Sequence, residues 1–200
     1  MPKSPRTILA IALLSAACAL PALADGADHA AAFERLRSLA GDWAGRMEDP
    51  LAGPPATVRY ELASGGRAIV AWQNAGQSFE SVVVYFLAGG KLRATLYSGA
   101  GNQPGYRLDK DSAADLLQFE LDGGTGFDSG RDGHVRRGEI RFVAPDRIEE
   151  RWFHYVGTRQ QGVTHWFLDR VKPATAPAAP APAAAPAAEK PPEPAAPASR

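Results

Sequence analysis

Hydrophobic and polar residues alternate along most of the chain between residues 43 and 171, and short turn signals interrupt the alternation. A period of two places successive side chains on opposite faces of an extended chain, so it predicts half-buried β-strands. The turns Ser64-Gly65-Gly66, Ala88-Gly89-Gly90 and Ala144-Pro145-Asp146 are typical of hairpins. The predicted strands are residues 43–47, 57–62, 67–73, 79–87, 91–98, 106–109, 116–121, 139–143, 147–155 and 163–171.

A different period precedes these strands. Between residues 30 and 39, the apolar residues Phe33, Leu36 and Leu39 recur at helical spacing with charged residues between them, which predicts a short surface helix. Sequential hairpins without crossover helices indicate an antiparallel meander, and closing the meander removes its exposed edges. We therefore predict an all-β fold, an up-and-down antiparallel β-barrel of about nine or ten strands with a short N-terminal helix. An open sandwich is the alternative.

The first 24 residues have the pattern of a secretory signal peptide. A charged start is followed by an apolar core too short for a membrane span and by the small-residue cleavage site Ala22-Leu23-Ala24. This pattern predicts a periplasmic or secreted protein. Cys18 is the only cysteine and lies in this segment, where lipid attachment is the alternative to removal. A removed signal leaves no cysteine for a disulfide or a thiolate metal site.

The composition changes abruptly at residue 173. Of the 28 residues from 173 to 200, 13 are Ala and 9 are Pro, which predicts a disordered tail because such a segment cannot bury a core. The tail is either inert or a spacer that contacts an envelope partner. Residues 25–172 remain as one domain, expected to be monomeric. Their 18 basic and 20 acidic side chains nearly balance, which argues against a nucleic-acid partner.

Short signals at the two ends of the strand region carry a resemblance. Gly41-Asp42-Trp43 opens the first strand and Arg170 ends the last. In lipocalin-like barrels, such a Trp plugs one end and an Arg of the final strand stacks on its face. Together with other stretches, these signals resemble a poorly characterised family of secreted, lipocalin-like (calycin-type) bacterial proteins. The other stretches are Phe33-Glu34 with Leu36 and Leu39-Ala40, Ser64-Gly65-Gly66, Glu80 to Tyr85, Tyr97 with Ala100-Gly101-Asn102-Gln103-Pro104, and Gly133-His134.

The resemblance implies a β-barrel in the cell envelope without a settled activity. This chain departs from the family where chemistry is expected, because members often have His or Cys at positions that are replaced here. The resemblance therefore implies that a metal or polar ligand held by those groups in relatives binds differently here. The replaced positions are Phe79, Phe86, Leu96, Ser98 and Arg136.

Five retained polar residues are the candidate ligand-binding residues. Tyr97, Asn102, Gln103 and His134 rank first, and Glu80 is a second-tier candidate. Asn102 and Gln103 lie in a strand-end loop, where two amides either bind a ligand or cap the backbone of the loop. Five aromatic residues at strand spacing are candidates for lining or filling the lumen. They are Trp72, Phe86, Tyr97, Trp152 and Phe167.

Other chemistry has weaker support. His154 and His165 lie on adjacent predicted strands and, with Glu150 or Glu80, suggest a metal site without forming a motif. A late-strand histidine such as His165 also ligates haem in the similar nitrobindin-type barrels. Glu149 and Glu150 point to opposite strand faces, so they are not paired carboxylates.

No metal, cofactor or catalytic residue is therefore assigned, and known catalytic motifs are mostly absent. We expect an exported barrel that binds a small apolar or amphipathic molecule in its lumen. The alternative is a structural or interaction module of the envelope with a packed lumen, and a haem-binding barrel or an enzyme comes after both.

Overall fold

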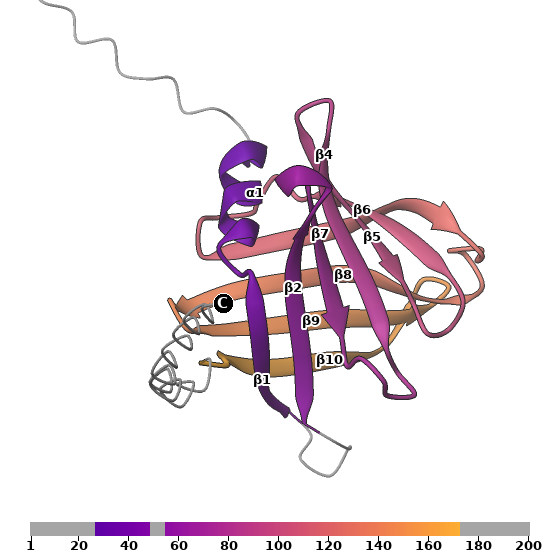
Figure 1. The fold of residues 1–200 in the computed structure, drawn as a ribbon. Helices are drawn as coiled ribbons and strands as arrows, with labels where there is room; N and C mark the ends of the chain where they lie inside the picture. The colour runs from indigo at the N-terminus through magenta and orange to yellow at the C-terminus, as the bar shows by residue number, and fades with distance from the viewer. Residues whose placement is uncertain (1–26, 49–54, 173–200) are drawn as a thin grey trace, which may run out of the picture.

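The structure is a computed structural model that describes residues 27–48 and 55–172 (Figure 1). The predicted signal peptide (residues 1–24) with Cys18, and the predicted tail (residues 173–200), lie outside the described residues. The described elements are α1 (His29–Arg37), β1 (Gly41–Met47), β2 (Ala56–Ala63), β3 (Ala68–Gln73), β4 (Ser81–Ala88), β5 (Lys91–Tyr97), β6 (Gln103–Leu108), β7 (Leu116–Thr125), β8 (Gly133–Ala144), β9 (Arg147–Val156) and β10 (Arg159–Arg170).

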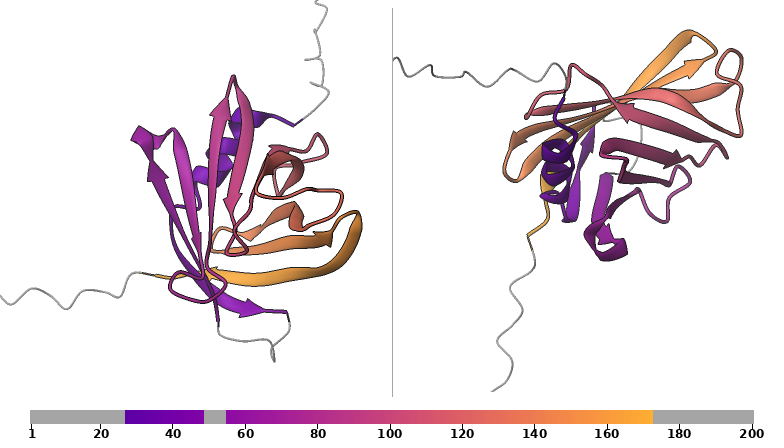
Figure 2. Two further views of the ribbon diagram at one scale, coloured as in Figure 1. Left: turned by 90° about the vertical axis from the view of Figure 1, so that its right-hand side faces the viewer. Right: turned by 90° about the horizontal axis from the view of Figure 1, so that it is seen from above.

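The ten strands form a closed antiparallel barrel in which each strand pairs with its neighbours in sequence (Figures 1 and 2). The first and last strands close the barrel, and in that pair Trp43 lies opposite Arg170. The predicted up-and-down barrel with a short N-terminal helix is therefore confirmed, and the open sandwich is wrong. No β-strand of the barrel is left with an unpaired edge.

The last hairpin is tighter than the sequence suggests. The predicted turn spans residues 157–162, but β10 already begins at Arg159, after a turn in which Gly157 adopts a φ of 57°. Glycine reaches this left-handed region without a steric penalty. A bulge between Gln160 and Gly162 then places Gly162, rather than a histidine, opposite His154.

Helix α1 lies across one end of the barrel and packs against β4 and β5 (Figure 1). It begins at the N-cap Asp28, whose carboxylate accepts two backbone N–H groups at 3.0 Å. Phe33 and Leu36 are buried, as the helical spacing predicts. His29 Nδ1 accepts the Leu92 N–H at 3.1 Å, so the first turn of the helix is tied to the β4–β5 hairpin.

Inward-facing side chains fill the half of the barrel next to α1. The largest of them are fully buried, and they come from strands all around the barrel. They make the packed core that holds the strands in register. The main members are Trp43, Tyr60, Tyr85, Phe119, Ile140, Ile148 and Leu168.

Four of the five aromatic lumen candidates do not face inward. Trp72 and Tyr97 are 38% and 51% exposed on the outer face, and Arg46 lies over the Phe167 ring on the outside of β10. Phe86 likewise alternates with the buried Tyr85. Only Trp152 points into the lumen. These strands are apolar on both faces, so alternation alone does not say which set is inside.

Candidate functional site

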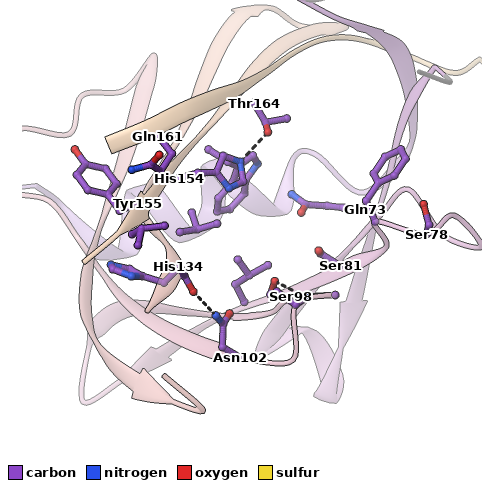
Figure 3. A pocket seen from close by; sticks show the side chains of 18 of the residues that line it. Gln73, Ser78, Ser81, Ser98, Asn102, His134, His154, Tyr155, Gln161 and Thr164 are labelled. Carbon is purple, nitrogen blue, oxygen red and sulfur yellow. Dashed lines mark hydrogen bonds between the residues drawn. The ribbon is translucent and has the colours of Figure 1, made fainter. Parts of the chain in front are cut away.

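The opposite half of the barrel holds a cavity of about 750 Å³ (Figure 3). Its lining comes from the strand ends farthest from α1, such as Met47 at the end of β1 and Ser81 at the start of β4. Within the part of the chain that the structure describes, the lining mixes apolar side chains with hydroxyl, amide and imidazole groups and contains no Asp, Glu, Lys or Arg. The lining side chains labelled in Figure 3 are Gln73, Ser78, Ser81, Ser98, Asn102, His134, His154, Tyr155, Gln161 and Thr164.

Two of the five predicted ligand-binding residues meet at this cavity. Asn102 and His134 both line it and are 6% and 5% exposed. Asn102 Nδ2 donates to the Gly133 carbonyl oxygen at 2.8 Å, so the amide holds the start of β8. The Asn102 side chain therefore connects its loop to β8 at the edge of the cavity, rather than capping the backbone of its own loop.

The hydrogen bonds of His134 define its tautomer. Its Nδ1 lies 3.0 Å from the Asp132 carbonyl oxygen, which can only accept, so Nδ1 carries the proton. In the neutral imidazole Nε2 is then a lone-pair acceptor, and among the described residues it has no hydrogen-bond partner. The ring is stacked near Phe127 and Tyr155, with centroid distances of 5.0 and 6.4 Å.

The other three predicted residues lie outside the cavity lining. Tyr97 is exposed because it has the outward parity of β5. Gln103 is held by Thr125, whose hydroxyl donates to its Oε1 at 2.8 Å. The Glu80 carboxylate accepts the Gly76 N–H at 2.6 Å and so closes a turn. These polar groups serve their own loops, which is the commoner role of such residues.

The two late histidines lie on opposite faces of the barrel wall. His154 lines the cavity, with Nε2 2.8 Å from Thr164 Oγ1, and burial lowers the pKa of His154. His165 faces outward, where Nδ1 lies 3.1 Å from a carboxylate oxygen of Glu48. The tight turn before β10 causes this separation, because it pairs His165 with Arg151.

The suggested metal and haem sites through these histidines are therefore wrong. His165 cannot approach a ligand in the lumen from the outer face. Within residues 27–48 and 55–172, no group of three or more His, Cys, Asp or Glu side chains is placed to hold a metal ion.

A buried carboxylate lies between the packed half and the cavity. Glu150 is fully buried and accepts hydrogen bonds from the Tyr60 hydroxyl, from Gln73 Nε2 at 3.1 Å and from Trp152 Nε1 at 3.0 Å. Burial raises the pKa of Glu150, and the three donors partly oppose this shift. Gln73 and Trp152 also line the cavity, so they form its floor above the carboxylate.

Sequence reasoning did not find this polar layer, although β9 carries a signal for it. Ile148, Glu150 and Trp152 share one strand face, so Glu150 interrupts an apolar, inward-facing row. Its partners Tyr60 and Gln73 come from β2 and β3 and are distant in sequence. A glutamate in such a row indicates a buried charge but does not identify its donors.

Trp166 adds a further unsatisfied group. The side chain is 5% exposed and lines the cavity, and among the described residues its indole Nε1–H has no acceptor. A buried N–H without an acceptor is costly, and most such groups in proteins have a partner. The residue lines the cavity, but its Nε1–H is itself buried away from the cavity space.

Three of the five positions at which this chain departs from the resembling family line the cavity. They are Phe79, Leu96 and Ser98, where His or Cys is often found in members. Phe86 and Arg136 lie outside the lining.

The closed end of the barrel is built around Trp43 and Arg170. The Arg170 guanidinium lies 4.3 Å from the centroid of the Trp43 ring. It donates to the carbonyl oxygens of Ser38 and Ala40, both at 2.8 Å, at the end of α1. Trp43 Nε1 donates to the Leu39 carbonyl oxygen at 2.8 Å. One guanidinium thus connects helix, first strand and last strand.

Comparisons with known proteins add little to this geometry. No family model matches the chain, and no curated protein matches it. Solved structures do match, among them the crystal structure of a protein of unknown function from the DUF3598 family of Nostoc punctiforme PCC 73102. That match has 16% sequence identity and a TM-score of 0.34, and it covers 68% of this chain and 48% of that chain. This chain thus spans about half the length of that protein.

Among the helices that the structure describes, none has the length and apolar character needed to cross a membrane.

Proposed function

We propose that the protein binds a small amphipathic molecule in the cavity at the end of the barrel away from α1. The observation that carries this proposal is a cavity of about 750 Å³ whose lining, as far as residues 27–48 and 55–172 form it, is apolar in part, polar in part and free of Asp, Glu, Lys and Arg side chains. Ligand pockets in proteins are about 300–1,000 Å³ and combine apolar walls with a few polar groups. Burial of an apolar ligand surface would contribute about 25 cal/mol per Å².

The polar side chains of the lining support an amphipathic rather than a purely apolar ligand. Gln73, Ser81 and Thr164 place amide and hydroxyl groups at the cavity, where an oxygen or nitrogen function of a ligand can form hydrogen bonds with them. The competing interaction-module hypothesis requires a packed lumen, and only the half next to α1 is packed.

We also propose that the ligand is met outside the cytoplasm. The support is the signal-like pattern of residues 1–24, ahead of a domain at residues 25–172 that contains no cysteine. The lipocalin-like family resemblance points to the same compartment. Native mass spectrometry of the full chain, exported by a bacterial host and purified gently, tests both parts. Cleavage near Ala24 and extra mass lost on denaturation support them, whereas an unprocessed chain contradicts export.

A pair of variants tests the cavity itself. Ser81 lines the cavity, and the next residue, Val82, has the opposite parity on β4. Ser81→Phe should fill part of the cavity and weaken binding of an amphipathic probe, followed by the fluorescence of Trp152 and Trp166 in the lining. Val82→Phe adds the same ring on the outer face and should leave binding unchanged. Equal effects of both substitutions would place the probe elsewhere.

A further inference from the structure

Glu150 is a buried carboxylate without a cationic partner among the described residues. It is 0% exposed, and none of the ion pairs within residues 27–48 and 55–172 includes it. Its hydrogen bonds come from three neutral groups, a phenol, an amide and an indole. Such donors favour the carboxylate form without cancelling its charge, and burial opposes that form by raising the pKa of Glu150. A cation bound nearby would favour the ionised carboxylate, because buried charges in proteins are usually paired.

Gln73 places the negative end of its amide dipole toward the cavity. Its Nε2 donates to the Glu150 carboxylate, which identifies the nitrogen side of the amide. The opposite atom of the same planar group, Oε1, is an acceptor, and the side chain extends into the cavity (Figure 3). The negative end of the amide dipole thereby adds to the field of the carboxylate behind it.

Trp152 also favours a positively charged group in the cavity. Its indole N–H donates to Glu150, and its ring forms part of the cavity lining. A ring edge that faces a carboxylate leaves the electron-rich face for other contacts, and indole faces attract cations. Gly138 lies opposite Trp152 in the β8–β9 ladder, and a Cβ at that position would lie 2.7 Å from the ring. The absence of a side chain there gives the indole its place.

Among the described residues, the lining has no Lys or Arg, and the lowered pKa of the half-buried His154 leaves that imidazole neutral at neutral pH. A carboxylate ligand would therefore meet no counter-ion and a buried negative charge below the floor. A protonated amine would meet an acceptor oxygen, an aromatic face and an attractive charge. At the low effective dielectric of such a site, charges several ångströms apart still interact appreciably.

We propose that the cavity selects amphipathic molecules whose polar end is a protonated amine, held against Gln73 Oε1 and the Trp152 ring above Glu150. This inference rests on the proposed lumen binding and names the chemical class of its ligand. The positive nitrogen lies at the cavity floor and the apolar part extends along the walls toward the open end. Glu150 acts at a distance and does not itself line the cavity.

Three probes with one alkyl chain test the charge preference. Decylamine, decanol and decanoate are titrated into the purified full-length protein at neutral pH, below their micellar concentrations, by isothermal titration calorimetry. Decylamine should bind about tenfold or more tightly than decanol, from the Coulomb attraction at an effective dielectric of about 20. Decanoate should bind most weakly. Glu150→Gln should bring decylamine and decanol to within about twofold of each other, because the charge is lost while the shape is kept.

Glu149→Gln is the matched control. Glu149 is the adjacent residue but faces outward, with its carboxylate 3.4 Å from His165 Nε2. It should leave the decylamine preference unchanged, and a loss equal to that in Glu150→Gln overturns the inference. If Glu150→Gln fails to fold, the three probes titrated into the wild-type protein still test the inference. Binding of all three probes without a preference for the amine overturns the inference and leaves lumen binding intact. Binding of none overturns both.

Discussion

Replacement of Arg170 by Met should destabilise the closed end of the barrel. The guanidinium donates to the carbonyl oxygens of Ser38 and Ala40 and lies over the Trp43 ring, whereas Met keeps only the aliphatic stem. The carbonyl oxygens of Ser38 and Ala40, just after α1, would then lose their donors. The strands β1 and β10 would also lose the contact between Trp43 and the residue 170 side chain. The expected result is a less stable barrel with an unchanged strand order.

The structure sets the size of the effect. Arg170 is 24% exposed, so its two bonds to carbonyl oxygens are worth about 1 kcal/mol each after discounting for solvent. Stacking on Trp43 adds about 1 kcal/mol. The pair with Asp146, which is 57% exposed, adds little. The free energy of unfolding should therefore fall by about 3 kcal/mol.

Urea denaturation of the full chain, followed by far-UV circular dichroism, measures this change. Arg147→Met is the matched control, because Arg147 pairs with Asp169 near the same end of the barrel but both side chains are more than 60% exposed. It should cost less than about 1 kcal/mol. Arg170→Lys should fall between the two, since it keeps the charge but loses the fork geometry. The reasoning is refuted if Arg170→Met is no more destabilised than Arg147→Met.

Three further predictions concern buried groups and close backbone contacts. Burial raises the pKa of Glu150 above 4.5, so its contribution to the free energy of unfolding should be present below about pH 4.5 and lost as the pH rises through the shifted pKa. Glu150→Gln should remove this loss in urea titrations at several pH values, and an unchanged profile would argue against it. Burial lowers the pKa of His154 below 6.5, so stability should be present above pH 6.5 and lost as the pH falls through the folded-state pKa. An NMR titration with a His154 midpoint at or above 6.5 would disprove this. Gly45→Ala should lower the melting temperature strongly, because the new Cβ would lie 1.8 Å from the Phe167 carbonyl oxygen, whereas Gly162→Ala meets nothing within 4 Å. Similar melting temperatures for the two variants would contradict the close contact at Gly45.

Local sequence patterns were sufficient for the barrel. Hairpin turns such as Ser64-Gly65-Gly66 and Ala88-Gly89-Gly90 match the structure because turn geometry depends on the few residues within the turn. The last hairpin shows the limit of this reasoning. The strand β10 begins earlier than predicted, so Gly162 pairs with His154. His165 pairs with Arg151 and lies on the opposite face of the sheet. In a strand, an odd shift in register exchanges the two faces.

The candidate site was predictable only in part. Asn102 and His134 lie at the cavity, whereas Tyr97, Gln103 and Glu80 do not line it. Each of these residues is polar and lies in or near a loop or strand end, so residue type alone does not separate the two groups. What separates them is the folded structure: Tyr97 has the outward parity of β5, and the side chains of Gln103 and Glu80 are bonded to Thr125 and Gly76, which lie outside the cavity lining.

The sequence by itself determined the order of the strands, a barrel of about nine or ten of them, and the terminal helix. These features follow from periodicity and turns, which are properties of short segments, whereas the Trp43–Arg170 closure was implied by the resemblance to lipocalin-like barrels. Only the tertiary structure decided that one half of the lumen is packed and the other hollow, and that Glu150 lies between them. That result depends on side chains from β2, β3 and β9 that meet inside one closed sheet, and no local pattern encodes their convergence.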